Sequence, residues 1–272
     1  MKTRILAPGI GFLFGFLALT AGAQSNCISL AQGGHFVAGS AILYTNGVLH
    51  TPTLPANSRI LKPNAASGTF ITYINEGGLS GWMPLPAAPT PGFGWIISVP
   101  TACSLCFSDS PPAATLPLNL VPGFFNMVCA TSFRTSTFED IVGRAPDPGT
   151  QLLKYIGSGD LALNSTNYLI YTFNNGVWSP SEPTVAPGEA VWVVQPPKIV
   201  NLQFGAGVFQ FQTLTVPSAS IAVEYSDTLD TPSWQTLTNL TGWGELGTVM
   251  DDTSTNIVGQ RFYRLNLPMS LP

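Results

Sequence analysis

The feature that most constrains the fold of this chain is an internal repeat. Three landmarks recur in the same order 96 positions apart: a Trp-x-Pro segment, a Pro-Gly turn and an apolar run. The matched segments are Trp82-Met83-Pro84 with Trp178-Ser179-Pro180, Pro91-Gly92 with Pro187-Gly188, and Trp95–Val99 with Val191–Gln195. Ordered matches over most of each stretch argue against chance similarity. We predict two tandem copies of one unit, over roughly residues 27–101 and 115–197.

Weaker matches upstream extend each predicted copy in the same order. They pair Leu30–Val37 with Leu120–Met127, Leu61-Lys62 with Leu153-Lys154, and Ile74–Gly77 with Phe173–Gly176. Bulky and small polar residues alternate in 69–74, the period of a half-buried strand, and 168–173 is the counterpart. Asn and Gly then supply turn chemistry, since both tolerate positive φ. The two apolar runs are typical of strands that are buried on both faces.

Helical periodicity is almost absent from the chain. Thr137–Arg144 is the best candidate for a short helix, with Thr135 or Ser136 as its cap and Glu139 and Asp140 in its first turn.

Charged residues make up 9% of the chain, against about 25% in ordinary soluble domains. The formal charge of −4 excludes nucleic acid as a partner, because binding to phosphates requires a basic face.

After about Pro197 the pattern changes to short alternating strands, such as Phe209–Gln212 and Ile221–Tyr225, separated by turn residues. Val223–Asp227, Trp234 and Gln260–Arg264 resemble the small fibronectin type III-like module that ends many exported bacterial proteins. The duplicated unit is similar to repeats in the same uncharacterised secreted proteins. The resemblance implies a cell-surface or extracellular context and carries no catalytic residues.

These observations predict an all-β fold: two tandem copies of a small β-rich unit, then a fibronectin type III- or immunoglobulin-like β-sandwich. The expected boundaries are 1–23 for a signal peptide, 24–114 for the first unit with its linker, 115–197 for the second unit and 198–272 for the sandwich.

The first 23 residues have the pattern of a secretory signal peptide. Lys2 and Arg4 precede an apolar run of 15 residues, and Ala21-Gly22-Ala23 supplies a cleavage site before Gln24. A membrane anchor needs a longer run, and Cys27 does not directly follow the small-residue box of a lipoprotein. We expect a protein that is secreted, or held in the periplasm or at the cell surface, with no membrane span in the mature chain.

Four cysteines are candidates for disulfides, because an exported compartment is oxidising: Cys27, Cys103, Cys106 and Cys129. Three pairings are possible, and the sequence does not choose among them. The Cys-Ser-Leu-Cys spacing is that of a redox pair, but flanking prolines at 100 and 111 predict a linker loop rather than an activating helix N-terminus. Zinc would require a second such motif or a histidine pair.

No catalytic residue, metal or cofactor is assigned. The two histidines, His35 and His50, accompany no Gly-x-Ser-x-Gly elbow and no HExxH motif. The adjacent acids in 139–140 and in 251–252 would point to opposite faces of a strand, so neither makes a natural acid/base pair. Asp251-Asp252 with Asp227 or Asp230 is a hypothetical calcium site, since hard cations bind clustered oxygens.

Six tryptophans in an exported β protein suggest sugar binding. We expect Trp95 and Trp192 to be buried, because both lie in apolar runs. Trp82 and Trp178 follow turns in both copies and are the candidate ligand-binding residues, although core packing is the commoner role of tryptophan.

The expected function is a non-catalytic, exported β-module protein for surface interaction or structural display. Its partner would be an extracellular glycan or a cell-surface component, since duplicated weak sites raise avidity. The alternatives are an extracellular carbohydrate-binding protein, a polysaccharide hydrolase with paired carboxylates, and a simple spacer.

Overall fold

A computed structural model provides the structure of the chain, and it is all-β with several sheets. It describes residues 26–39, 43–45, 48–50, 54–64, 69–77, 81–86, 90–107, 114–130, 134–157, 167–215, 220–230, 233–241, 245–252 and 260–266. The predicted leader lies outside the described residues.

The first large sheet is antiparallel and has five strands in the order β2-β8-β5-β6-β7. These strands are β2 (Gly33–Ala38), β8 (Gly94–Val99), β5 (Arg59–Asn64), β6 (Thr69–Gly77) and β7 (Gly81–Met83). Strand β8, the first predicted apolar run, has neighbours on both sides and is almost wholly buried.

The second large sheet repeats this arrangement in the order β10-β16-β12-β13-β14. Its strands are β10 (Phe125–Cys129), β16 (Ala190–Val194), β12 (Gln151–Tyr155), β13 (Tyr168–Asn174) and β14 (Val177–Ser179). Every residue of β16, which covers most of the second apolar run, is buried. Matched in chain order, each strand of one sheet has the same neighbours as its counterpart in the other.

Strand register gives a finer comparison of the two sheets than sequence matching does. Leu61 lies opposite Ile96, and Leu153 lies opposite Trp192, which preserves the offset of 96 between β8 and β16. Elsewhere the match moves by one residue. Val37 lies opposite Trp95 and Val128 opposite Val191, so Val37 corresponds to Val128 rather than to Met127. By the same reasoning Asn75 corresponds to Phe173, because each lies opposite the tryptophan of the next strand.

Smaller elements surround the two large sheets. Strand β1 (Asn26–Leu30) pairs with β9 (Cys103–Phe107), so the segment that was predicted to be a linker loop is a strand. The short strands β3 (Leu43–Thr45) and β4 (Val48–His50) form a hairpin, and β4 contains His50. Strand β11 (Ser136–Thr137) pairs with β15 (Thr184–Val185).

The predicted short helix is present as α1 (Phe138–Val142). Its N-cap is Thr137, one residue beyond the predicted caps, because Thr137 and Asp140 form a capping box in which each side chain bonds the other's backbone N–H. Gly143 ends the helix in the left-handed conformation.

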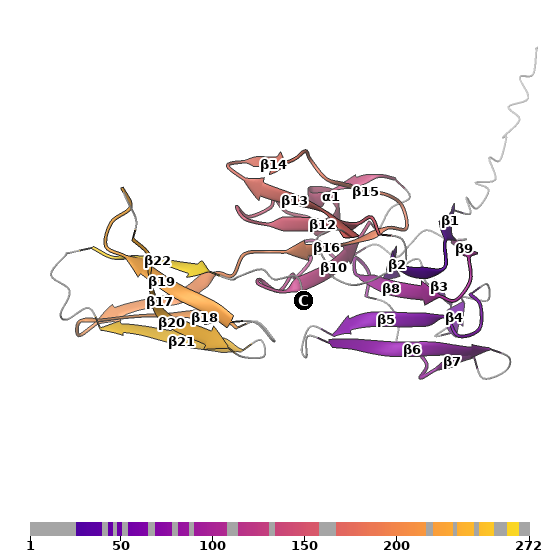
Figure 1. The fold of residues 1–272 in the computed structure, drawn as a ribbon, viewed down its shortest axis with the longest axis horizontal. Helices are drawn as coiled ribbons and strands as arrows, with labels where there is room; N and C mark the ends of the chain where they lie inside the picture. Colours follow the sequence, from indigo (N-terminus) through magenta and orange to yellow (C-terminus); the bar gives the residue numbers. More distant parts are fainter. Residues whose placement is uncertain are drawn as a thin grey trace, which may run out of the picture.

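The C-terminal region forms two three-stranded antiparallel sheets, in the orders β17-β18-β21 and β20-β19-β22. Their strands are β17 (Ile199–Gly205), β18 (Val208–Leu214), β21 (Leu246–Asp252), β20 (Gln235–Thr241), β19 (Ser220–Ser226) and β22 (Phe262–Asn266). Phe211 and Val249 from the first sheet and Val223 from the second share one buried core. Figure 1 shows this region at one end of the molecule, the second large sheet in the middle and the first at the other end.

Candidate functional site

The two large sheets meet at a joint with reciprocal contacts. Val37 of β2 bridges to Glu189, and in the matching positions Val128 of β10 bridges to Phe93. The Ala38 N–H donates to the Gly188 carbonyl at 2.9 Å. The corresponding Cys129 N–H donates to the Gly92 carbonyl at 3.0 Å. Each sheet therefore presents the same edge and the same Pro-Gly turn to the other, as in the two-fold interface of a dimer.

A single hydrophobic cluster runs through this joint. Phe36 of the first sheet stacks on Tyr155 of the second, with ring centroids 5.1 Å apart, and packs edge-on against Trp192. Trp95 and Trp192 are 1% and 3% exposed, so the prediction that both are buried is confirmed. The cores of the two sheets are therefore continuous.

Gly94 and Ala190 occupy corresponding positions at the centre of the joint. A Cβ on Gly94 would lie 2.4 Å from the Ala190 Cβ and 2.8 Å from Met127 Cγ. Real carbon atoms do not approach this closely, so the first sheet needs a glycine where the second has an alanine.

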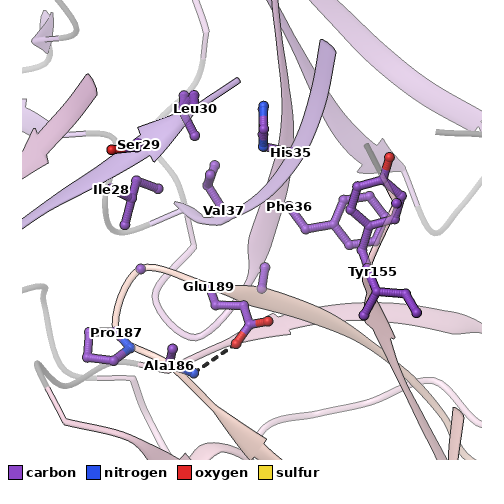
Figure 2. A pocket seen from close by; sticks show the side chains of 14 residues that line it. Ile28, Ser29, Leu30, His35, Phe36, Val37, Tyr155, Ala186, Pro187 and Glu189 are labelled. Carbon is purple, nitrogen blue, oxygen red and sulfur yellow. Dashed lines mark hydrogen bonds between the residues drawn. The ribbon is translucent and has the colours of Figure 1, made fainter. Parts of the chain in front are cut away.

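A cleft of about 360 Å³ opens on one side of the joint. It is lined from the first sheet's side by β1 and β2, and from the second sheet's side by the end of β12 and the turn before β16. Figure 2 shows Ile28, Leu30 and His35 across from Ala186, Pro187 and Glu189. The volume falls in the range of ordinary small-molecule sites, about 300–1,000 Å³.

Glu189 is the acidic group of this larger cleft. Its carboxylate accepts a hydrogen bond from the Ala186 N–H at 2.9 Å and pairs with Lys154 Nζ at 2.9 Å. The Lys154 and Glu189 side chains are 27% and 21% exposed, so the pair is partly removed from water. Lys154 Nζ also donates to the Thr184 carbonyl. The pair fixes the Pro-Gly turn against β12.

His35 and Tyr155 supply further polar atoms of the larger cleft. His35 Nε2 lies 2.7 Å from the Ala31 carbonyl, and because a carbonyl only accepts, this nitrogen carries the proton. The Tyr155 ring has Phe36 against it, and a Cβ on Gly157 would lie within 3 Å of it. Little of the Tyr155 ring is therefore open to a flat ligand.

A second cleft of about 190 Å³ lies at the corresponding place on the other side of the joint. Lys62, Phe93, Gly94 and Met127 line it, at the positions matched to Lys154, Glu189, Ala190 and Phe36. Where the larger cleft has Glu189, the smaller cleft has Phe93. The smaller cleft contains no carboxylate among its described lining residues.

The structure does not bring the predicted ligand-binding tryptophans together as an exposed platform. Trp82 is 8% exposed and belongs to the core, so its faces are not available to a sugar. Trp178 is partly buried and packs against Phe138 and Phe173, with ring centroids 5.5 and 5.3 Å apart. Phe173 from the preceding strand and Phe138 from α1 cover part of the Trp178 ring, and sequence spacing alone does not reveal these contacts.

Two of the acidic residues in the calcium hypothesis, Asp227 and Asp251, are instead bound to an arginine. Arg261 donates to Asp227 at 2.8 Å and to Asp251 at 2.9 Å, and Tyr263 donates to Asp251 at 2.7 Å. Hydrogen bonding to Asp227 and Asp251 raises the pKa of Arg261, and burial raises the pKa of Tyr263. In the described part of the chain, no three His, Cys, Asp or Glu residues gather as a metal site. The guanidinium supplies the positive charge that the calcium hypothesis assigned to a cation.

Two of the four disulfide candidates are not bonded. Cys103 and Cys129 form no disulfide, and they lie opposite Leu30 and Ala190 rather than another cysteine. Burial raises the pKa of the Cys103 thiol, which disfavours the reactive thiolate. Cys27 lies directly opposite Cys106 in the β1–β9 ladder.

Sequence reasoning missed Lys62, Lys154 and Glu189, because single charged residues in a strand are usually solvated. A signal was available in the repeat. Lysine occurs at the matched position of both copies, whereas Glu189 falls where the first copy has Phe93.

Comparison with known proteins adds no relative. The chain matches no known protein family, and no curated protein or solved structure is significantly similar to it. Across the residues that the structure describes, no helix has the length and apolar character that a membrane span requires.

Proposed function

We propose that this is an exported, non-catalytic protein for surface interaction or structural display, built from two copies of one β unit and a fibronectin type III-like sandwich. The identical strand order of the two five-stranded sheets supports the duplication. Two three-stranded sheets around one core support the sandwich. The leader pattern supports export.

The larger cleft at the joint is the observation that carries a binding role. Both sheets contribute to its walls, so it forms only where the two copies meet. It combines apolar walls with a few polar groups, among them Glu189, His35 and Ser29, as ligand sites commonly do. The lining of the larger cleft contains a single acid, Glu189, which fits a role in binding rather than catalysis by paired carboxylates.

The test is to fill the larger cleft and measure binding. Ser29 is exposed on β1 and lines the cleft, so Ser29→Trp would obstruct it. Thr72→Trp places the same ring on an exposed position of β6, outside the cleft, and is the matched control. We expect the wild type and Thr72→Trp to bind a component of an extracellular glycan and cell-wall panel, and Ser29→Trp to lose at least about tenfold in affinity. Equal binding by Ser29→Trp would refute the cleft as the site.

The carbohydrate-binding alternative now depends on Trp178, because Trp82 is buried. Trp178→Ala should weaken glycan binding if its partly exposed ring contacts a sugar, and leave binding unchanged if the larger cleft is used.

The hydrolase alternative has little support. Two carboxylates about 5–10 Å apart are needed in a concave site. Glu189 is the only acid that lines either described cleft.

A further inference from the structure

The matched lysines of the two sheets have different partners. Lys154 forms its ion pair with Glu189 at 2.9 Å. Lys62 occupies the same register position in β5, because it follows Leu61, which lies opposite β8, as Lys154 follows Leu153, which lies opposite β16. Phe93 stands where Glu189 would be. In the described part of the chain, no carboxylate pairs with Lys62.

Lys62 is held at the smaller cleft by a ring rather than by a charge. Its Nζ lies 5.8 Å from the centroid of the Trp95 ring, within the range of a cation–π contact, and Trp95 is 1% exposed. The Lys62 side chain is half-buried. A partly desolvated ammonium therefore borders a cavity without an internal anion.

The rest of the smaller cleft is mainly apolar. Phe93, Phe125, Met127 and Pro63 provide carbon surface, and Thr90 supplies a hydroxyl at the exposed end. Asn126 does not compete for a ligand, since its side chain bonds the backbone of Val121, Phe124 and Val193. The cleft therefore pairs one cation with apolar walls.

We propose that the smaller cleft binds a small organic carboxylate with an apolar body, whose carboxylate pairs with Lys62 as Glu189 pairs with Lys154. Its volume of about 190 Å³ suits a ligand of roughly benzoate size, since a cavity of about 150 Å³ holds benzene. The second sheet shows that a lysine at this register position can pair with a carboxylate, although Phe93 fills the place of Glu189 and the ligand would reach Lys62 from the cleft. This site is separate from the larger cleft and does not depend on the proposed function.

In the experiment, the full mature chain is titrated with benzoate, and binding is measured by calorimetry and by ligand-observed NMR. Benzamide is the neutral control of the same shape, and sulfate tests a small anion without an apolar body. The variants are Lys62→Gln, which removes the cation, and Phe93→Glu, which places a carboxylate where Glu189 lies in the second sheet. Lys154→Gln is the matched control in the other copy. Thermal unfolding shows that each variant is folded.

We expect the wild type and Lys154→Gln to bind benzoate with similar affinity, and benzamide at least about tenfold more weakly. Lys62→Gln should lose about tenfold or more in affinity, the size typical of a charge-assisted contact. Phe93→Glu should lose benzoate binding although Lys62 is still present. Failure of the wild type to bind at millimolar benzoate, equal affinity for benzamide or sulfate, or unchanged binding by Lys62→Gln would each overturn the proposal. If Phe93→Glu does not fold, Lys62→Gln decides the outcome.

Discussion

The two clefts at the joint are built on one backbone plan and carry different chemistry. Strand order, bridge positions and the Pro-Gly turn correspond across the joint. The side chains at matched positions differ, with Glu189 against Phe93, His35 against Asn126, Tyr155 against Pro63, and Ala190 against Gly94. The two sheets thus share a backbone scaffold, and the side chains at a few lining positions set what each cleft can hold.

The difference in charge follows from one substitution. Glu189, which lines the larger cleft, pairs with Lys154 beside it, whereas Lys62, which lines the smaller cleft, has the Trp95 ring as its partner among the described residues. The acidic group of the larger cleft is therefore neutralised by its neighbour, and the smaller cleft presents a net positive charge.

The largest expected difference between the two copies comes from a crosslink that only the first can have. We expect a Cys27–Cys106 disulfide, because directly opposed residues in an antiparallel pair have Cα atoms about 4.5–5.5 Å apart, within disulfide range. Cys27→Ser with Cys106→Ser should lower the free energy of unfolding by about 2–4 kcal/mol. Urea unfolding measures this.

Mass spectrometry of the non-reduced, alkylated protein identifies the bond. The peptides of Cys27 and Cys106 should be linked, and Cys103 and Cys129 should carry the label after denaturation. Linked Cys103 or Cys129 would contradict the expected pairing.

The centre of the joint gives the next largest effect. Gly94→Ala should lower the free energy of unfolding by about 1–3 kcal/mol, because its Cβ would overlap the Ala190 Cβ and the backbones must separate. Gly205→Ala is the matched control, since nothing lies within 4 Å of the added carbon there. A Gly94→Ala protein as stable as Gly205→Ala would show that the joint is looser than described.

Periodicity and turn residues in the sequence predict much of the fold, but they do not predict the joint between the two large sheets. The apolar runs at β8 and β16, the helix at α1 and the burial of Trp95 and Trp192 follow from local patterns. The bridge from Val37 to Glu189 joins residues far apart in the chain, so no local pattern indicates it.

The same lack of a local signal explains why the predicted ligand-binding site at the tryptophans is wrong for Trp82. Trp82 follows a turn, which suggests exposure, yet tertiary packing places it in the core. The prolines that flank the Cys103 segment predict a loop, whereas pairing with β1 makes this segment a strand. In both cases a distant segment overrides a local signal.

Neutralising the matched charges tests the contrast between the clefts. Glu189→Gln should lower the free energy of unfolding by about 0.5–1 kcal/mol, because it breaks a partly screened ion pair with Lys154. Lys62→Gln should change it by no more than about 0.5 kcal/mol, the low end for a cation–π contact, because Nζ lies 5.8 Å from the Trp95 ring centroid, near the outer limit of such contacts. Chemical unfolding at low and high salt measures both, and the Glu189 effect should shrink with salt. Equal effects at the two positions would show that the lysines have equivalent environments.

A further difference between the two sheets concerns Tyr168, which register matches to Phe70 of the first sheet. Tyr168 is 4% exposed, and no hydrogen bond of full geometry reaches its hydroxyl from the described residues, although the Trp192 side chain interacts with it. Tyr168→Phe makes the second sheet resemble the first at this point. It should change the free energy of unfolding at pH 7 by no more than about 1 kcal/mol, because removing a poorly hydrogen-bonded buried hydroxyl is offset by the lost contact with Trp192.

The contribution of Tyr168 to the free energy of unfolding depends on pH only in alkali. Burial raises the pKa of Tyr168 to about 12, against about 10 in an unfolded chain. The folded state therefore favours the neutral phenol, so stability from this group is complete below about pH 10 and is lost as the pH rises toward 12. Urea unfolding between pH 9 and 11 should show a smaller alkaline loss in Tyr168→Phe than in the wild type. Identical alkaline slopes would mean that the Tyr168 phenol ionises as freely in the fold as in the unfolded chain.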